Sequence, residues 1–190
     1  MTNWTKKRSI MKRYDLTAQM YDTRYEAEQK AKINAALNAI KKTRLGLLLD
    51  AGCGTGILFE HISDFADTIL GVDFSSQTLR QAKKRLGEQK HARIYLVQAD
   101  VDNMPFRHHV FDNVFAITVL QNVPDAKRAV KEMIRVGKDN ATYVLTGLKR
   151  IFSQDNFETI LSEANLKAET LENDELKCHV AICKEMHKQQ

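Results

Sequence analysis

The sequence predicts an α/β fold: a mostly parallel sheet of seven strands, with helices on both faces and one antiparallel edge strand. Short apolar runs alternate with segments of helical composition along the chain. Strands separated by helices of ten or more residues pair in parallel through crossover connections. The last two apolar runs are separated only by a turn around Asn173 and Asp174, so they must pair antiparallel. A length of 190 residues suits a single domain with its own core.

The individual elements are predicted from apolar spacing and from helix caps. Tyr14, Ala18, Tyr21 and Tyr25 lie three or four residues apart, which places them on one face of a helix within 14–43. A short helix is expected to begin at Ile57, directly after a glycine loop. Serine and aspartate are good N-caps, so further helices are expected after Ser75 or Ser76, after Asp125 and after Ser153. Apolar runs of strand length predict strands at 45–50, 68–74, 92–100, 110–120, 141–148, 167–172 and 177–184.

The positive charge of the chain is concentrated at its N-terminus. Residues 1–45 contain eleven Lys and Arg against four Asp and Glu, whereas residues 46–190 contain eighteen against twenty. We therefore divide the chain into a basic helical extension or lid, 1–44, and a core, 45–190. The basic segment is either a solvated helix surface or a binding site for an anionic partner such as RNA.

Composition also limits where the protein can work. No stretch approaches 18 consecutive uncharged apolar residues, so no membrane span is expected. The N-terminus lacks the apolar core of a secretory signal, although its basic, acid-free start also fits an amphipathic transit peptide. Three cysteines cannot form a full disulfide framework, and no metal site is expected. A cytoplasmic protein is the simplest interpretation.

Three predicted strands end in an acid: Asp50, Asp73 and Asp100. The carboxyl ends of parallel strands meet at one edge of the sheet, which is where ligands bind in open α/β folds. The loop after Asp50 reads Gly52-Cys53-Gly54-Thr55-Gly56, one residue short of the dinucleotide-binding motif G-x-G-x-x-G. A carboxylate directly before this loop would repel a pyrophosphate and attract a cation.

The residues after the second and third strands predict an adenosine site. Asp73 suits hydrogen bonds to two ribose hydroxyls, and Phe74 can pack on an adenine face. Asp100 could accept from the exocyclic amine, and the N–H of Val101 could meet a ring nitrogen. An adenosine with a cationic tail and no phosphates describes S-adenosylmethionine.

The chain resembles the class I S-adenosylmethionine-dependent methyltransferases, which have a Rossmann-like fold. The resemblance rests on LLLDAGCGTG (47–56), GVDFS (71–75), VQADVDNMPF (97–106) and FDNVFAITVLQNVPD (111–125). It is greatest for the ubiquinone- and menaquinone-biosynthesis type, whose N-terminal helix is similar to 14–29.

This resemblance implies a role for individual residues. The loop of Asp50, Ala51, Gly52 and Gly54 would serve the methionine end of the cofactor. Asp73 would hold the ribose, with Phe74, Asp100 and Val101 at the adenine. Thr118 would approach the methionine amino group through its backbone, and Tyr21 would lie over the methionine carboxylate or the acceptor cleft.

No residue stands out as a dedicated general base. Methyl transfer from a sulfonium mainly needs alignment and exclusion of water. Gln121 and Asn122 could orient the acceptor, or could only cap the following segment. Together with Tyr21 they are the catalytic candidates.

The acceptor is the open question. Connections after the fifth strand and between the last two strands are short, so only the N-terminal segment could cover the cleft. An open cleft beside a basic segment favours a macromolecule, RNA or protein, as acceptor. The alternative is a small molecule such as a quinone precursor, with the N-terminal helix as a lid. A non-catalytic scaffold is a third hypothesis. Relatives of this kind also imply an activator subunit as a candidate partner.

Overall fold

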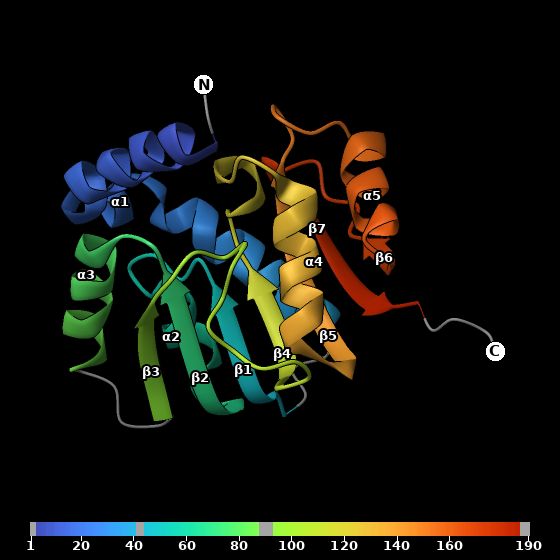
Figure 1. Ribbon diagram of the computed structural model, residues 1–190, viewed down its shortest axis with the longest axis horizontal. Helices are drawn as coiled ribbons and strands as arrows, with labels where there is room; N and C mark the ends of the chain where they lie inside the picture. The colour runs from blue at the N-terminus through green and yellow to red at the C-terminus, as the bar shows by residue number, and fades with distance from the viewer. Residues whose placement is uncertain (1–2, 41–43, 88–92, 187–190) are drawn as a thin grey trace.

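The sheet has seven strands in the order β3-β2-β1-β4-β5-β7-β6 (Figure 1). The computed structural model describes residues 3–40, 44–87 and 93–186, apart from the side chains of residues 3, 4, 6 and 13–26. Every strand pair from β3 to β5 is parallel, and β7 is antiparallel to both of its neighbours. The strands are β1 (Gly46–Ala51), β2 (Ala66–Asp73), β3 (Arg93–Gln98), β4 (Phe111–Ala116), β5 (Gly137–Leu148), β6 (Leu166–Thr170) and β7 (Cys178–Glu185).

The predicted fold class is confirmed, with a difference in the place of the antiparallel strand. We expected that strand at the edge of the sheet, but β7 lies between β5 and β6, and β6 forms the edge. The reason is the crossover after β5, which places β6 one strand position further out. The chain then turns back over a short connection, and β7 fills the gap that was left.

The helices agree with the predicted caps. Ser75 Oγ accepts from the Thr78 N–H, Asp125 from that of Arg128 and Ser153 from that of Asn156, so three helix starts are confirmed. The N-terminal helix is longer than expected and begins at Asn3. The helices are α1 (Asn3–Ala39), α2 (Ile57–Ile62), α3 (Ser76–Leu86), α4 (Ala126–Val136), α5 (Gln154–Glu163) and a 3-10 turn η1 (Leu120–Asn122).

Two apolar layers enclose the central strands. Leu48 and Phe115 pack with α2 and with the C-terminal part of α1 on one face, whereas Leu49 and Val114 pack with α4 and α5 on the other. All four side chains are completely buried, which explains why these strands read as nearly continuous apolar runs. Among the described residues, no helix has the length and apolar character needed to cross a membrane.

The fourth strand is shorter than its apolar run of 110–120. β4 ends at Ala116, and Thr118 takes a left-handed backbone conformation with a φ of 66°. A residue in this conformation cannot continue a strand, so the chain leaves the sheet there. This early exit places 117–124 over the carboxyl ends of the strands, where α1 also crosses (Figure 1).

Candidate active site

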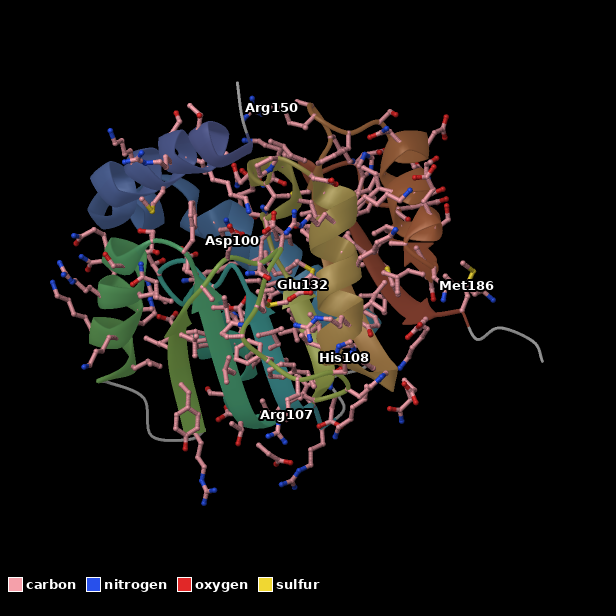
Figure 2. All side chains as sticks on the ribbon, viewed as in Figure 1. Asp100, Arg107, His108, Glu132, Arg150 and Met186 are labelled. Atoms are coloured by element: carbon pink, nitrogen blue, oxygen red, sulfur yellow. The ribbon has the colours of Figure 1, made fainter. Side chains whose placement is uncertain are left out.

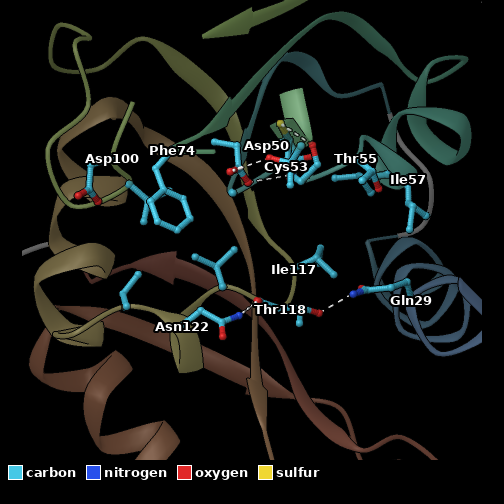
Figure 3. A pocket seen from close by; sticks show the side chains of 18 of the residues that line it. Gln29, Asp50, Cys53, Thr55, Ile57, Phe74, Asp100, Ile117, Thr118 and Asn122 are labelled. Carbon is cyan, nitrogen blue, oxygen red and sulfur yellow. Dashed lines mark hydrogen bonds between the residues drawn. The ribbon is translucent and has the colours of Figure 1, made fainter. Parts of the chain in front are cut away.

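An open pocket of about 970 Å³, its solvent mouth included, lies at the carboxyl ends of β1, β2 and β4 beneath α1. Figure 3 shows Asp100 and Phe74 at one end of it, and Thr55, Ile57 and Gln29 at the other. The conserved geometry of open α/β sheets puts a ligand site at this edge. Nine of the residues singled out in the sequence line the pocket: Asp50, Gly52, Gly54, Asp73, Phe74, Asp100, Val101, Thr118 and Asn122.

The glycine loop follows β1 and makes the floor of the pocket. The N–H groups of Gly52 and Cys53 both donate to the carbonyl of Val72, at 2.7 and 2.8 Å, which ties the loop to β2. Gly52 has a φ of 81°, and a Cβ on it would lie 2.5 Å from Cγ2 of Val119. The loop can therefore pass close under Val119 only because residue 52 has no side chain.

Asp50 is a buried carboxyl with one oxygen that lacks a partner among the described residues. Its side chain is at the end of β1, the residue is 2% exposed, and Oδ2 makes no hydrogen bond within the described part of the chain. Burial, and secondarily the nearby charge of Asp73, raise the pKa of Asp50 to about 8. A cation bound here would restore the ionised form and satisfy the unpartnered oxygen.

Asp73 is held in place by donors from the glycine loop and from the start of α3. Its Oδ2 accepts from the Gly54 N–H at 3.0 Å. Its Oδ1 accepts from the Ser75 N–H at 2.9 Å and from Oγ1 of Thr78 at 3.0 Å. This carboxylate therefore fixes both the glycine loop and the start of α3, as well as facing the pocket.

Asp100 has a partner that the sequence did not indicate. Lys7, near the start of α1, places its Nζ 2.6 Å from Oδ2 of Asp100 and 2.6 Å from Oδ1 of Asp102. Burial alone would lower the pKa of Lys7, but its hydrogen bonds to the two carboxylates outweigh this and raise it. Asp100 itself lies beyond the end of β3, in the turn that begins there (Figure 2).

Thr118 forms the pocket wall opposite the glycine loop. Its N–H donates to Oγ1 of Thr146 at 2.7 Å, and its carbonyl accepts from Nδ2 of Asn122 at 2.9 Å. Its hydroxyl donates to Oε1 of Gln29 at 3.1 Å and accepts from Nζ of Lys32 at 2.9 Å. The turn after β4 is therefore bonded to α1 as well as to β5.

Two expected residues do not line the pocket, and the side chain of a third is not described. Ala51 is fully buried and packs in the core, because successive strand residues point to opposite faces. Gln121 does not line the pocket, since successive side chains of a 3-10 turn diverge and Asn122 takes the inward position. Tyr21 belongs to α1, but its side chain lies outside the described residues.

The sequence interpretation missed most of the apolar lining. Gln29 and Ile33 come from α1, and their helical spacing was the only signal for them. The others lie within the motifs that were assigned to the cofactor or directly after them, and their residue types alone could not separate pocket from core. They are Thr55, Ile57, Leu58, Ile117, Val119, Val123 and Pro124.

A protein-family model described as "Methyltransferase domain" matches residues 49–145. Demethylmenaquinone methyltransferase of Thermobifida fusca is 31% identical over 137 residues, covering 72% of this chain and 57% of that protein. Malonyl-[acyl-carrier protein] O-methyltransferase of Pseudescherichia vulneris is 27% identical over 142 residues, covering 75% of this chain and 54% of that protein. The chain thus spans about half the length of these relatives.

Solved structures share the fold at low identity. The DhpI–SAH complex matches with a TM-score of 0.79 and 19% identity, covering 96% of this chain and 98% of the other. The complex between the Haloferax volcanii Trm112 activator and a putative methyltransferase matches with a TM-score of 0.77 and 15% identity, covering 92% of this chain and 98% of the other. The family match over half of the chain shows that it belongs to the S-adenosylmethionine-dependent methyltransferases, class I, and confirms the expected proximity to the menaquinone type.

Proposed function

We propose that this chain transfers a methyl group from S-adenosylmethionine to a small, largely apolar molecule, with α1 as the lid of the site. The observation that carries the proposal is the buried Oδ2 of Asp50 beside the glycine loop, which has no hydrogen-bond partner among the described residues. An orphaned buried acceptor is costly, and a cationic ligand group would satisfy it. The methionine ammonium is such a group.

The residues that line the pocket supply a candidate contact for each part of the cofactor. Asp50 and the loop of Gly52 and Gly54 would hold the methionine end, and Asp73 the ribose. Phe74, Val101 and Asp100 would hold the adenine, at the end of the pocket where Figure 3 shows Phe74 and Asp100 together. When bound, the cofactor supplies an electrophilic methyl group on its sulfonium.

The acceptor would enter at the opposite end of the pocket. Its wall there carries the aliphatic side chains of Ile57 and Ile117, with Gln29 and Thr55 as the polar groups. No charged side chain lines that end among the described residues, so a phosphate or carboxylate would be left without a counter-charge. This favours an uncharged acceptor with an apolar body.

The ion pairs of two basic N-terminal residues argue against the macromolecular acceptor that the charge of this segment favoured. Lys7 pairs with Asp100 and Asp102, and Arg44 pairs with Asp67 at the surface, so these two cations already have acidic partners within residues 45–190. The names of the relatives point the same way, since demethylmenaquinone is a small molecule and malonyl is a small acyl group, although it is carried on a protein. The small-molecule alternative is therefore the better supported one. An activator subunit stays a prediction.

The protein side of the reaction consists of alignment and exclusion of water. The described residues that line the pocket include no histidine, and Asp50 and Asp73 belong to the cofactor side. Gln29 and Thr55 can orient a hydroxyl or carbonyl of the acceptor, while α1 closes the site to solvent.

Calorimetric titration with S-adenosylmethionine and S-adenosylhomocysteine (SAH) tests the cofactor. Labelled S-adenosylmethionine, incubated with the protein and separate small-molecule, RNA and protein fractions, tests the acceptor. We expect binding of both ligands and label in the apolar small-molecule fraction. Absence of binding would refute the methyltransferase proposal, and label confined to RNA or protein would refute the acceptor class.

Replacing Lys7 with methionine tests the lid. The variant loses both ion pairs to Asp100 and Asp102, which are largely buried, with side-chain exposures of 17%, 30% and 4% for the three residues. We expect SAH to associate and dissociate about tenfold faster, the rate equivalent of ~1.4 kcal/mol. Stopped-flow fluorescence measures both rates.

Lys12→Met is the matched control, since Lys12 is an exposed lysine of the same helix. Its rates should equal those of the unaltered protein. Identical exchange rates in the Lys7 and Lys12 variants would show that α1 does not gate the pocket through Lys7.

A further inference from the structure

Lys32 is a lysine buried behind the pocket wall. It belongs to the part of α1 that packs on the sheet and contributes the core residues Ile33, Ala36 and Leu37, and it is 1% exposed. Its Nζ lies 2.9 Å from Oγ1 of Thr118 and 3.3 Å from Oε1 of Glu28. It does not line the pocket itself.

A charge at this position needs an explanation. Burying an ammonium group costs several kcal/mol unless its partners compensate, and an apolar side chain would pack here without that cost. Glu28 is 24% exposed and also has Nζ of Lys177 at 3.8 Å, so it does not itself require Lys32. Lys32 also hydrogen-bonds to the thiol of Cys178, but burial raises the pKa of that thiol, so it is neutral and needs no counter-charge. The shorter contact, to Thr118, is the one that connects Lys32 to the pocket.

Thr118 has a backbone conformation that is unfavourable for its residue type. A φ of 66° is uncommon for any non-glycine residue and more so for a β-branched one. Such conformations persist only where the surroundings impose them. Thr146 holds the N–H, Asn122 the carbonyl, and Gln29 and Lys32 the hydroxyl. Two of these four partners come from α1.

We propose that Lys32 is a positioning residue that holds Thr118 in the left-handed conformation, and so shapes the pocket wall that faces the methionine end of the cofactor. The cofactor part of this inference rests on the proposed function. Lys32 acts from behind the wall: its ammonium donates to Oγ1 of Thr118 and leaves the hydroxyl proton for Gln29. The seating of α1 on the sheet thereby sets the form of the binding site.

Lys32→Met is the variant that tests this role. Methionine has nearly the length of lysine and suits a buried position beside core residues of α1, and Glu28 keeps Lys177 as a partner, so the variant is expected to fold. Two measurements apply. The amide and Cα NMR shifts of Thr118 in the ligand-free protein report its conformation, and calorimetry with SAH reports the consequence for binding.

We expect the Thr118 signals to shift and the affinity for SAH to fall about tenfold, as for the loss of a hydrogen bond from a charged donor. Lys12→Met should change neither. In a Thr118→Val background, Lys32→Met should lower the affinity much less, because the hydroxyl through which Lys32 acts is already gone. Lys32→Gln, which keeps a donor, should retain part of the affinity.

The outcomes separate this inference from the proposed function. If the unaltered protein does not bind SAH, the proposed function fails, while the Thr118 shifts still decide whether Lys32 holds that residue. Unchanged Thr118 signals overturn the inference. An unchanged affinity for SAH in a variant that is only less stable to urea also overturns it. Failure of both the Met and the Gln variants to fold does the same, because Lys32 would then have a structural role only.

Discussion

Replacing Asp73 with alanine is expected to weaken the binding of SAH by about 1–3 kcal/mol, a factor of roughly 5 to 150 in affinity. The carboxylate is the proposed acceptor for the ribose hydroxyls. It also receives the N–H groups of Gly54 and Ser75 and the hydroxyl of Thr78. The variant loses the ligand contact and at the same time releases the glycine loop from β2. Calorimetry with SAH measures the affinity.

The free energy of unfolding of the Asp73→Ala variant should fall together with its affinity for SAH, because the donors from Gly54, Ser75 and Thr78 lose a buried acceptor. Urea denaturation measures that part separately. Asp139→Ala is the control: its carboxylate is 79% exposed, bonded to His109, and far from the pocket. That variant should bind SAH normally. Undiminished affinity in the Asp73 variant would remove this residue from the cofactor site.

Local pattern was enough to predict the elements and the edge of the sheet where the site lies. Apolar runs mark strands, and Ser75, Asp125 and Ser153 mark helix starts, because both signals depend only on neighbouring residues. Asp50 and Asp73 followed from the same reasoning, since parallel strands bring their carboxyl ends together.

Contacts between distant segments could not be predicted in this way. Lys7 and Asp100 are 93 residues apart, and Lys32 and Thr118 are 86 apart. The basic N-terminal segment was visible as a charge imbalance, but its use in ion pairs with core acids depends on how α1 crosses the sheet. The charge alone therefore favoured an external anionic partner over an internal one.

Fine backbone geometry was the second source of error. The left-handed conformation of Thr118 ends β4 early, and the following 3-10 turn sends Asn122 inward while Gln121 is not on the pocket surface. Neither follows from an apolar run. β7 lies between β5 and β6 because the crossover after β5 skips one strand position. The antiparallel pairing of the last two strands does not by itself show which of them forms the edge.

Replacing Asp50 with asparagine is expected to stabilise the ligand-free protein at neutral to alkaline pH. The pKa of this carboxyl is about 8 in the folded state, because of its burial and of the charge of Asp73, against 3.8 for an ordinary aspartate. Between these values the unfolded chain gives up a proton that the folded protein keeps. The free energy of unfolding therefore falls as pH rises, by up to about 1.4 kcal/mol per pH unit, and the loss ends above pH 8.

Asparagine has the same shape and no titration, so the Asp50→Asn variant escapes this loss. Its advantage over the unaltered protein should be small near pH 4 and grow to several kcal/mol at pH 8, on the order of what the raised pKa implies. Urea denaturation of both proteins at pH 5, 6.5 and 8 measures the difference, in which all other titrating groups cancel. Parallel pH curves would show that Asp50 is ionised in the empty pocket.

The same carboxyl links stability to function. A cationic ligand group that binds beside Asp50 requires the ionised form, so at pH 7 SAH should bind with release of close to one proton. Calorimetry in two buffers of different ionisation enthalpy detects that proton, and Asp50→Asn should abolish it while weakening SAH. A more stable protein that binds its ligand less well would show that the buried, unpartnered carboxyl is kept for binding, at the expense of the empty fold.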